Sequence, residues 1–241
     1  MRTKRLLATL LVLIMATATV GATYLLTTNN RRSSSTSSSI ATISVSPKDI
    51  MTQVEIGQTF TVNITITNAS DLYVWQAGMI FNATILEALN FAEGQFLTEY
   101  GNTLWVNATI NNTAGIIHYH ASALAGDVSG VSGNGTLGII TFKVRTYSNS
   151  TLQLTEVILL NSTLSDMDKT LVHGTILATI PGDVNGDRRV DIFDIGTISS
   201  HWYPGPPEGP LGFDGNADIN DDEAVDILDI DITSAHWGQT W

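Results

Sequence analysis

Two stretches near the end of the sequence carry oxygen-bearing side chains at the same spacing. Each is twelve residues long, with aspartate or asparagine at positions 1, 3, 5, 9 and 12. These side chains are Asp183, Asn185, Asp187, Asp191 and Asp194 in the first stretch, and Asp218, Asn220, Asp222, Asp226 and Asp229 in the second. Position 7 offers a backbone carbonyl, from Arg189 and Ala224. Such alternating oxygen ligands suit Ca²⁺, whereas Mg²⁺ demands a stricter octahedron and keeps its water. The sequence therefore predicts two Ca²⁺ sites, one in each loop.

The alternative interpretation is a pair of acidic turns on a solvated surface. Two copies in register favour metal loops, because each is followed by an apolar, helix-like stretch that ends in His-Trp, at Trp202 and at Trp237. Two departures stand against the usual pattern. Position 6, commonly Gly, is Arg188 or Glu223, and position 12 is Asp instead of the longer Glu. A non-Gly residue held at positive φ costs about 1–2 kcal/mol, so we expect weaker Ca²⁺ binding, not its loss.

The charge of the chain is concentrated in this same region. The sequence has 23 acidic and 11 basic residues, a net charge of −12. From Gly182 onward there are 13 acidic residues and 2 basic ones, a net charge of −11, so the preceding residues carry only about −1. Dense negative charge repels itself in a compact segment unless cations neutralise it. This pattern supports metal binding and argues against nucleic acid as a partner.

The first 32 residues are typical of an export signal. Three basic residues precede an apolar run from Leu6 to Leu26, close to the ~20 residues that span a bilayer. A cleaved signal peptide is the competing interpretation, with Ala16-Thr17-Ala18 as a small-residue cleavage site. Either way, the rest of the chain is expected outside the cell or at its surface. Residues 33–40 are Ser-rich and predict a flexible linker.

Residues 41–180 alternate between apolar and polar side chains, as in Phe60 to Ile66, and turn residues separate the runs. No helical period is evident in this stretch. The predicted strands are 41–45, 59–67, 72–81, 85–91, 103–110, 116–124, 138–145, 152–160 and 171–180, with a Gly-rich break at 126–135. Eight to nine short strands predict an all-β, two-sheet sandwich. The sequence contains no cysteine, which excludes disulfides and thiolate chemistry.

Other candidate sites in this stretch are weaker. Eight Asn-x-Ser/Thr sequons could accept glycans on an exported chain, at Asn63, Asn68, Asn82, Asn107, Asn111, Asn134, Asn149 and Asn161. His118 and His120 could hold a metal or act as a base, although a solvated strand face explains them more simply. Trp75 and Trp105 could stack a sugar or belong to the core. No nucleophile elbow, phosphate loop or zinc spacing is present, so we do not expect an enzyme.

The duplicated loops, each leading into one helix, resemble a dockerin module over residues 181–241. The most specific fragment is Gly182-Asp183-Val184-Asn185-Gly186-Asp187. The resemblance implies a small helical, calcium-dependent domain of two loop–helix repeats that binds cohesins, with the loop residues given above as ligands. It also implies that recognition residues stand at loop positions 10 and 11. Here these are Ile192-Phe193 and Ile227-Leu228, more apolar than the Ser/Thr pairs of well-known bacterial modules.

Residues 41–180 resemble a cohesin or the related carbohydrate-binding-module fold, a jelly-roll-like sandwich. The resemblance rests on Gly57–Val62, Trp75–Phe81 followed by Leu86–Phe91, and Gly135–Val144. It implies a sheet face that binds dockerin helices and performs no chemistry.

We therefore expect a non-catalytic, calcium-dependent protein–protein assembly protein of the cell surface. Its partners would be cohesin or dockerin modules of the same or other surface proteins. The expected docking face comprises Phe193, Ile195, Ile198, Trp202, Leu228, Ile230 and Trp237. The alternative is a carbohydrate-binding protein that acts in polysaccharide attachment or breakdown.

Overall fold

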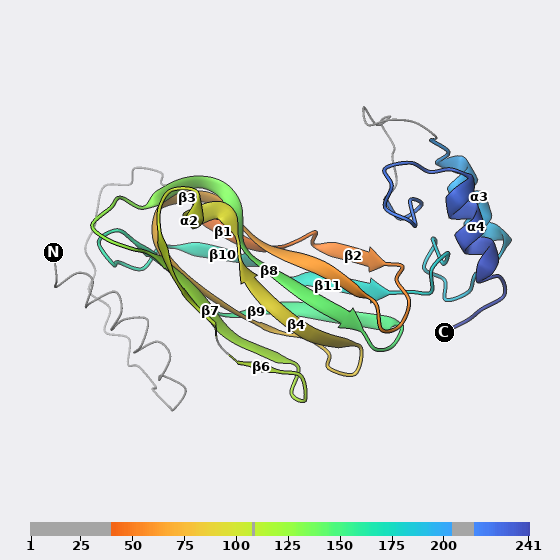
Figure 1. Cartoon of the computed structure of the whole chain (residues 1–241), viewed down its shortest axis with the longest axis horizontal. Helices are drawn as coiled ribbons and strands as arrows, with labels where there is room; N and C mark the ends of the chain where they lie inside the picture. Colours follow the sequence, from red (N-terminus) through yellow and green to blue (C-terminus); the bar gives the residue numbers. More distant parts are fainter. Residues whose placement is uncertain (1–39, 108, 204–214) are drawn as a thin grey trace.

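The computed structural model describes residues 40–107, 109–203 and 215–241, which form a strand-rich body followed by two helices (Figure 1). The strands are β1 (Ala41–Ser46), β2 (Asp49–Thr52), β3 (Thr59–Ile80), β4 (Leu86–Glu93), β5 (Thr103–Val106), β6 (Ile110–Asn111), β7 (Ile116–Leu124), β8 (Val131–Val144), β9 (Ser148–Asn161), β10 (Lys169–Val172) and β11 (Gly174–Ala178). The helices are α2 (Gln95–Thr98), α3 (Ile192–Ser200) and α4 (Ile227–Ala235). The predicted leader, residues 1–32, lies outside the described residues. No helix in the described ranges is long and apolar enough to cross a bilayer.

Strand β3 belongs to both layers of the sandwich. Its first half pairs with β1 and β8, and its second half pairs with β7 and β9. The register against β8 shifts between Ile66 and Leu72, where Asn68 and Asp71 have positive φ values of 56° and 63°. The Asp71 carboxylate holds this bend by accepting hydrogen bonds from Gly130 N at 2.8 Å and from Ser162 Oγ at 2.7 Å. These contacts lower the pKa of Asp71 despite its partial desolvation.

The prediction of a sandwich is confirmed, but several boundaries were wrong. The expected strands 59–67 and 72–81 are one 22-residue strand, because Asn68 and Asp71 bend the chain without ending the ladder. Strand β8 begins at Val131, inside the expected Gly-rich break, because Gly133 and Gly135 pair with the bend of β3. The runs 103–110 and 171–180 are each divided into two strands, and β2 was missed.

The core lies between the two layers. Trp75 is 1% exposed, and its ring centroid lies 6.2 Å from that of Phe91 and 5.7 Å from that of Trp105. His120 is also buried, with its ring 4.2 Å from Phe91, and burial lowers its pKa. The expectation of a solvated face was wrong for His120, because a register irregularity between β3 and β7 places it in the core. Trp75 is likewise not available to stack a sugar.

The two helices pack around a second, smaller core. Its buried members are Val184, Ile198, Ala217 and Val225, and Tyr203, Ile219 and Ile230 pack against them. Of the expected docking face, Ile198 therefore lies inside the helical module, and Ile230 is half-buried against the same core. The sandwich core contains none of these residues.

Replacing the buried indole tests the position of the sandwich core. We expect Trp75→Ala to lower the free energy of unfolding by about 3–5 kcal/mol, because it leaves a cavity beside two aromatic rings. Denaturant unfolding measures the loss. Leu89→Ala on β4 is the control, since Leu89 is exposed, and should change stability by less than about 0.5 kcal/mol. Equal effects of the two substitutions would contradict the assignment of Trp75 to the core.

Candidate metal centre

The two acidic loops have the same internal hydrogen-bond frame. In both, the side chains at positions 1, 3 and 5 accept hydrogen bonds from the backbone N–H groups of positions 6, 5 and 7. In the first loop these bonds are Arg188 N to Asp183 at 3.1 Å, Asp187 N to Asn185 at 2.8 Å and Arg189 N to Asp187 at 3.0 Å. In the second they are Glu223 N to Asp218 at 2.9 Å, Asp222 N to Asn220 at 3.1 Å and Ala224 N to Asp222 at 3.0 Å. The repeat seen in the sequence is therefore a repeat of backbone geometry.

Positions 9 and 12 start the helices. Asp191 is the N-cap of α3, and its Oδ1 accepts a hydrogen bond from Phe193 N at 2.9 Å. Asp194 completes the capping box by accepting from Asp191 N at 2.8 Å. Asp226 and Asp229 do the same for α4. Because an N-cap satisfies otherwise orphaned N–H groups, loop closure and helix initiation use the same carboxylates.

The strain expected at position 6 is present. Arg188 and Glu223 have φ values of 78° and 67°. Position 4 is also left-handed, with Gly186 at 71° and Asp221 at 57°, a feature that the sequence reasoning missed. The second loop therefore holds two non-Gly residues at positive φ, where the first holds one.

The carboxylates at the first and last loop positions are buried. Asp183, Asp194 and Asp229 are 0% exposed and Asp218 is 6% exposed. Desolvation is the largest cause of the raised pKa of Asp183, Asp194 and Asp218, although backbone hydrogen bonds oppose it. Asp183 Oδ1 is buried and has no hydrogen-bond partner. Buried carboxylate oxygens are costly unless a proton or a cation balances them.

These observations fit a hard cation as the missing partner. The oxygens are carboxylate, amide and carbonyl groups, the donor set that Ca²⁺ prefers, and one of them is an orphaned buried acceptor. Among the described side chains, no group of three or more His, Cys, Asp or Glu residues converges as a metal site. The carboxylates turn instead toward backbone N–H groups. The ligand assignments made from the sequence stay predictions.

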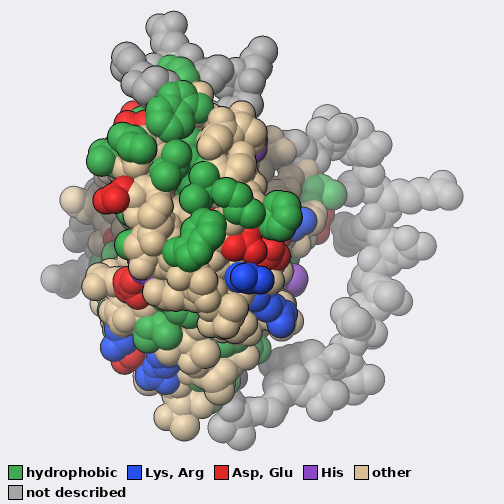
Figure 2. Space-filling view, turned by 90° about the vertical axis from the view of Figure 1, so that its right-hand side faces the viewer, with side chains coloured by type: hydrophobic (Ala, Val, Ile, Leu, Met, Phe, Trp, Pro, Cys, Tyr) green, Lys and Arg blue, Asp and Glu red, His purple; other side chains and the backbone are tan. Residues whose placement is uncertain are grey.

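Exposed apolar pairs stand at the start of each helix, at loop positions 10 and 11. Ile192 and Phe193 on α3 are 60% and 70% exposed, and Ile227 and Leu228 on α4 are 61% and 52% exposed. Figure 2 looks onto this end of the molecule, where apolar side chains gather beside charged ones. Trp202 and Trp237 are also exposed. Large apolar side chains grouped on a surface mark an interaction site.

The helical module contacts the residues that follow β2 from three places: just before the first loop, just before the second loop and at the C-cap of α4. Gln53 Oε1 accepts a hydrogen bond from Gly182 N at 3.1 Å, and the Gln53 amide donates to Asn216 O. His236 Nε2 lies 2.7 Å from Glu55 Oε1.

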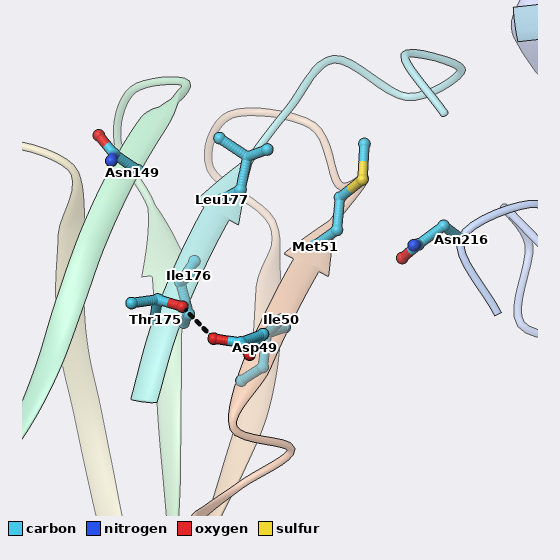
Figure 3. Close-up of a pocket in the computed structure, with 8 residues that line it drawn as sticks. All are labelled: Asp49, Ile50, Met51, Asn149, Thr175, Ile176, Leu177 and Asn216. Carbon is cyan, nitrogen blue, oxygen red and sulfur yellow. Dashed lines mark hydrogen bonds between the residues drawn. The ribbon is translucent and has the colours of Figure 1, made fainter. Parts of the chain in front are cut away.

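A groove of about 450 Å³ separates the two parts beside the edge strand β2 (Figure 3). Asp49, Met51, Leu177 and Asn216 are among its lining residues. Asp49 Oδ1 accepts a hydrogen bond from Thr175 Oγ1 at 2.6 Å, which ties β2 to β11. Asn216 reaches this groove from the helical module.

The family model for the cohesin domain matches residues 49–180. The chain belongs to the cohesin family. Directly after this domain, the family model for the dockerin type I domain matches residues 181–236. Cohesin and dockerin are non-catalytic assembly domains, so the chain combines two modules for protein–protein assembly, and its partners are cohesin or dockerin modules. The resemblances drawn from the sequence are confirmed.

Solved structures similar to the sandwich include a non-cellulosomal cohesin from the archaeon Archaeoglobus fulgidus, 18% identical with a TM-score of 0.48 over 61% of this chain and 96% of that one. The seventh ScaB type I cohesin from Pseudobacteroides cellulosolvens is 18% identical with a TM-score of 0.47, over 58% of this chain and 93% of that one. A type I cohesin–dockerin complex from Clostridium thermocellum includes a chain 11% identical with a TM-score of 0.48, over 61% and 98%. No curated protein matches the sequence.

Substitution at Glu223 tests the loop strain. We expect Glu223→Gly to raise the free energy of unfolding of the dockerin module by about 1 kcal/mol, because glycine adopts positive φ without the Cβ clash. Chemical denaturation at one fixed, saturating Ca²⁺ concentration measures the change. The matched control is Glu223→Ala, which removes the charge but keeps Cβ. An equal gain for both variants would assign the effect to charge and contradict the strain.

The buried carboxylates predict a pH dependence that reverses with metal. A pKa raised above its ordinary value of 3.8 means that the folded module binds protons more tightly than the unfolded chain. This contribution is present below that value and is lost as pH rises through the raised pKa. In chelator, the melting temperature of the dockerin module should therefore fall as pH rises from about 4 toward 7. With Ca²⁺ it should rise, because protons compete with the cation for the same oxygens. A melting temperature that rises with pH in chelator would contradict this account.

Proposed function

We propose that this chain is a calcium-dependent, non-catalytic assembly protein of the cell surface. The observation that carries the proposal is the shared frame of the two loops, whose buried carboxylates also cap α3 and α4. The cap places exposed apolar pairs at the start of each helix. The position of the docking surface therefore depends on closure of the two loops.

The twelve predicted ligands would hold two Ca²⁺ ions, one in each loop. When bound, Ca²⁺ supplies positive charge that balances carboxylates which the protein has removed from water. Asp191 and Asp226 then keep the first turn of each helix in place through their capping bonds. Without a cation, repulsion among the loop carboxylates opposes the closed loop, and the helices lose order.

The docking surface that we propose consists of Ile192, Phe193, Ile227 and Leu228, with Trp202 and Trp237 beside them. All six are at least 47% exposed, and the acidic loops border them. A partner cohesin would bury these side chains on a sheet face. The hydrophobic effect, at about 25 cal/mol per Å², would supply most of the affinity.

Export and glycosylation complete the proposal. The apolar run at residues 6–26 would direct the chain out of the cell as a cleaved signal peptide or an anchor, and residues 33–40 would tether it. The sequon asparagines that the structure leaves exposed are Asn68, Asn82, Asn107, Asn111, Asn134 and Asn149, whereas Asn63 and Asn161 are half-buried. Glycans on the exposed sites would cover the sandwich without entering its core.

Two measurements test this function. Far-UV circular dichroism of the 181–241 fragment, which has its own apolar core, should show a gain of helix on titration with Ca²⁺. The fragment should then bind cohesin modules, with the 41–180 fragment of this chain included in the panel, and lose them in chelator. No gain of helix at millimolar Ca²⁺ would contradict the proposal.

Substitution of the apolar pairs locates the docking surface. We expect the double variant Phe193→Ala/Leu228→Ala to weaken cohesin binding at least about tenfold, since buried aromatic and aliphatic anchors dominate interfaces. Calorimetry measures the affinity, and circular dichroism checks that the helices persist. Ser199→Ala on the exposed side of α3 is the control and should bind normally. Unchanged affinity in the double variant would exclude these residues from the interface.

A further inference from the structure

The two loops differ in how they meet the rest of the chain. The first loop follows β11 almost directly, and Gly182, the residue before it, donates its N–H to Gln53 of the sandwich at 3.1 Å. The Gln53 amide also donates to Asn216 O, two residues before the second loop. The second loop faces a groove of about 470 Å³, lined by Asp218 and Asp221 from the loop and by Thr59 and Thr61 from β3. In the described chain, the first loop therefore packs directly on the sandwich, whereas the second faces a groove and is tied to the sandwich through Asn216, just before it.

Two apolar side chains of the sandwich, Met51 and Leu177, support the first loop. Met51 and Leu177 are register partners on the parallel strands β2 and β11, so their side chains project to the same side (Figure 3). Gly186, at loop position 4, lies over them. A Cβ added there would come within 3.3 Å of Leu177 Cδ2 and 3.7 Å of Met51 Cε. Gly186 thus adopts the positive φ that the turn requires and lets the loop backbone approach Met51 and Leu177 closely.

Trp241 links the same loop to the sandwich from the other side. Its indole Nε1–H donates to Asp183 Oδ2 at 2.8 Å. Its ring centroid lies 6.4 Å from that of Tyr147, in the turn between β8 and β9, and 5.4 Å from Arg188 Cζ. One side chain therefore touches the position-1 carboxylate, the position-6 residue and the sandwich.

The two carboxylate oxygens of Asp183 differ in their hydrogen bonding. Oδ2 accepts from both Arg188 N and Trp241 Nε1, whereas Oδ1 is buried without a partner. In the second loop, Asp218 Oδ1 already accepts from Asp222 N at 3.1 Å, and Oδ2 accepts from Glu223 N. The two position-1 carboxylates are therefore not equivalent. Only the one in the first loop, within the described residues, combines a free buried oxygen with an indole donor.

We propose that Trp241 is a positioning residue for the cation site of the first loop, and that it links cation binding there to the seating of the dockerin module on its own sandwich. The position-1 carboxylate of the second loop has no such indole link, so we expect the second loop to bind its cation independently of Trp241. This inference rests on the proposed calcium function. Its consequence is that Ca²⁺ bound in the first loop orients the module on the sandwich through Trp241.

The test uses the full chain and Ca²⁺ alone as the probe. Isothermal titration calorimetry of Asp183→Asn and Asp218→Asn assigns the two binding events to the two loops. Trp241→Phe keeps the ring but removes the N–H. It should weaken the first-loop event about tenfold, the loss expected for one charge-assisted hydrogen bond, and change the second by less than about twofold. Tyr100→Phe is the matched control, because it also removes one donor from an aromatic side chain, here an exposed one in the sandwich, and it should leave both events unchanged.

Two further readouts separate linkage from a local effect. Tyr147→Ala, a change in the sandwich, should weaken the first-loop event about threefold, within the range for a lost aromatic pair. In ¹H–¹⁵N spectra, the Trp241 indole N–H should shift during the first-loop event and not during the second. The Gly182 amide should shift in step with it.

Several outcomes would overturn the inference. Trp241→Phe could leave first-loop affinity unchanged, or weaken both loops equally, and either result excludes a site-specific role. Normal first-loop binding in Tyr147→Ala would exclude the link to the sandwich. If the unmodified chain binds two Ca²⁺ ions while these variants behave normally, only this inference fails. If it binds none, the calcium-dependent function fails with it.

Discussion

Burial of aspartate carboxylates is the constraint on which the dockerin half depends. The first and last ligand positions of each loop are removed from water, and the hydrogen bonds that hold them come mainly from backbone N–H groups rather than from basic side chains. Arg189 approaches Asp191 at 3.5 Å, but its side chain is largely exposed, and such pairs contribute little. The module therefore has a negative interior that only protons or cations can balance.

The sandwich is stabilised in a different way from the dockerin module. Its stability comes from aromatic and branched aliphatic side chains between two layers that share one bent strand. Polar residues are used where the chain must turn, as Asp71 is at the bend of β3. The result is a body stabilised by apolar burial, and the dockerin module contacts the residues that follow its strand β2. The chain thus joins a sandwich stabilised by apolar burial to a module whose buried carboxylates must be balanced by protons or cations.

Much of this organisation could be predicted from the sequence, because it rests on periodicity. The alternation from Phe60 to Ile66 gave the strands, and the repeated spacing of aspartates gave the loops and the start of both helices. Positions that depend on tertiary contacts were not predictable. The burial of His120 follows from a register irregularity, and the continuity of β3 through Asn68 follows from a bend fixed by distant loops. Ile198 and Ile230 have the helical spacing of a surface stripe, but only the packing of α3 on α4 reveals that they face inward. Trp241 carried no motif at all, and its contact with Asp183 spans 58 residues.

The valines at loop position 8 have a consequence for how the dockerin module folds. Val225 exchanges two backbone hydrogen bonds of 2.8 Å with Tyr203, which follows α3. Val190 does the equivalent with Gly238 and Gln239, which follow α4, at 2.8 and 3.0 Å. Each half-module is thus completed by a strand segment from the other, as two subunits complete each other in an obligate dimer. We therefore expect that neither repeat folds by itself. The two repeats of one chain pair with each other as two subunits would. If the chain were cut between them, folding of the module would require the two fragments to associate, and it would then depend on their concentration.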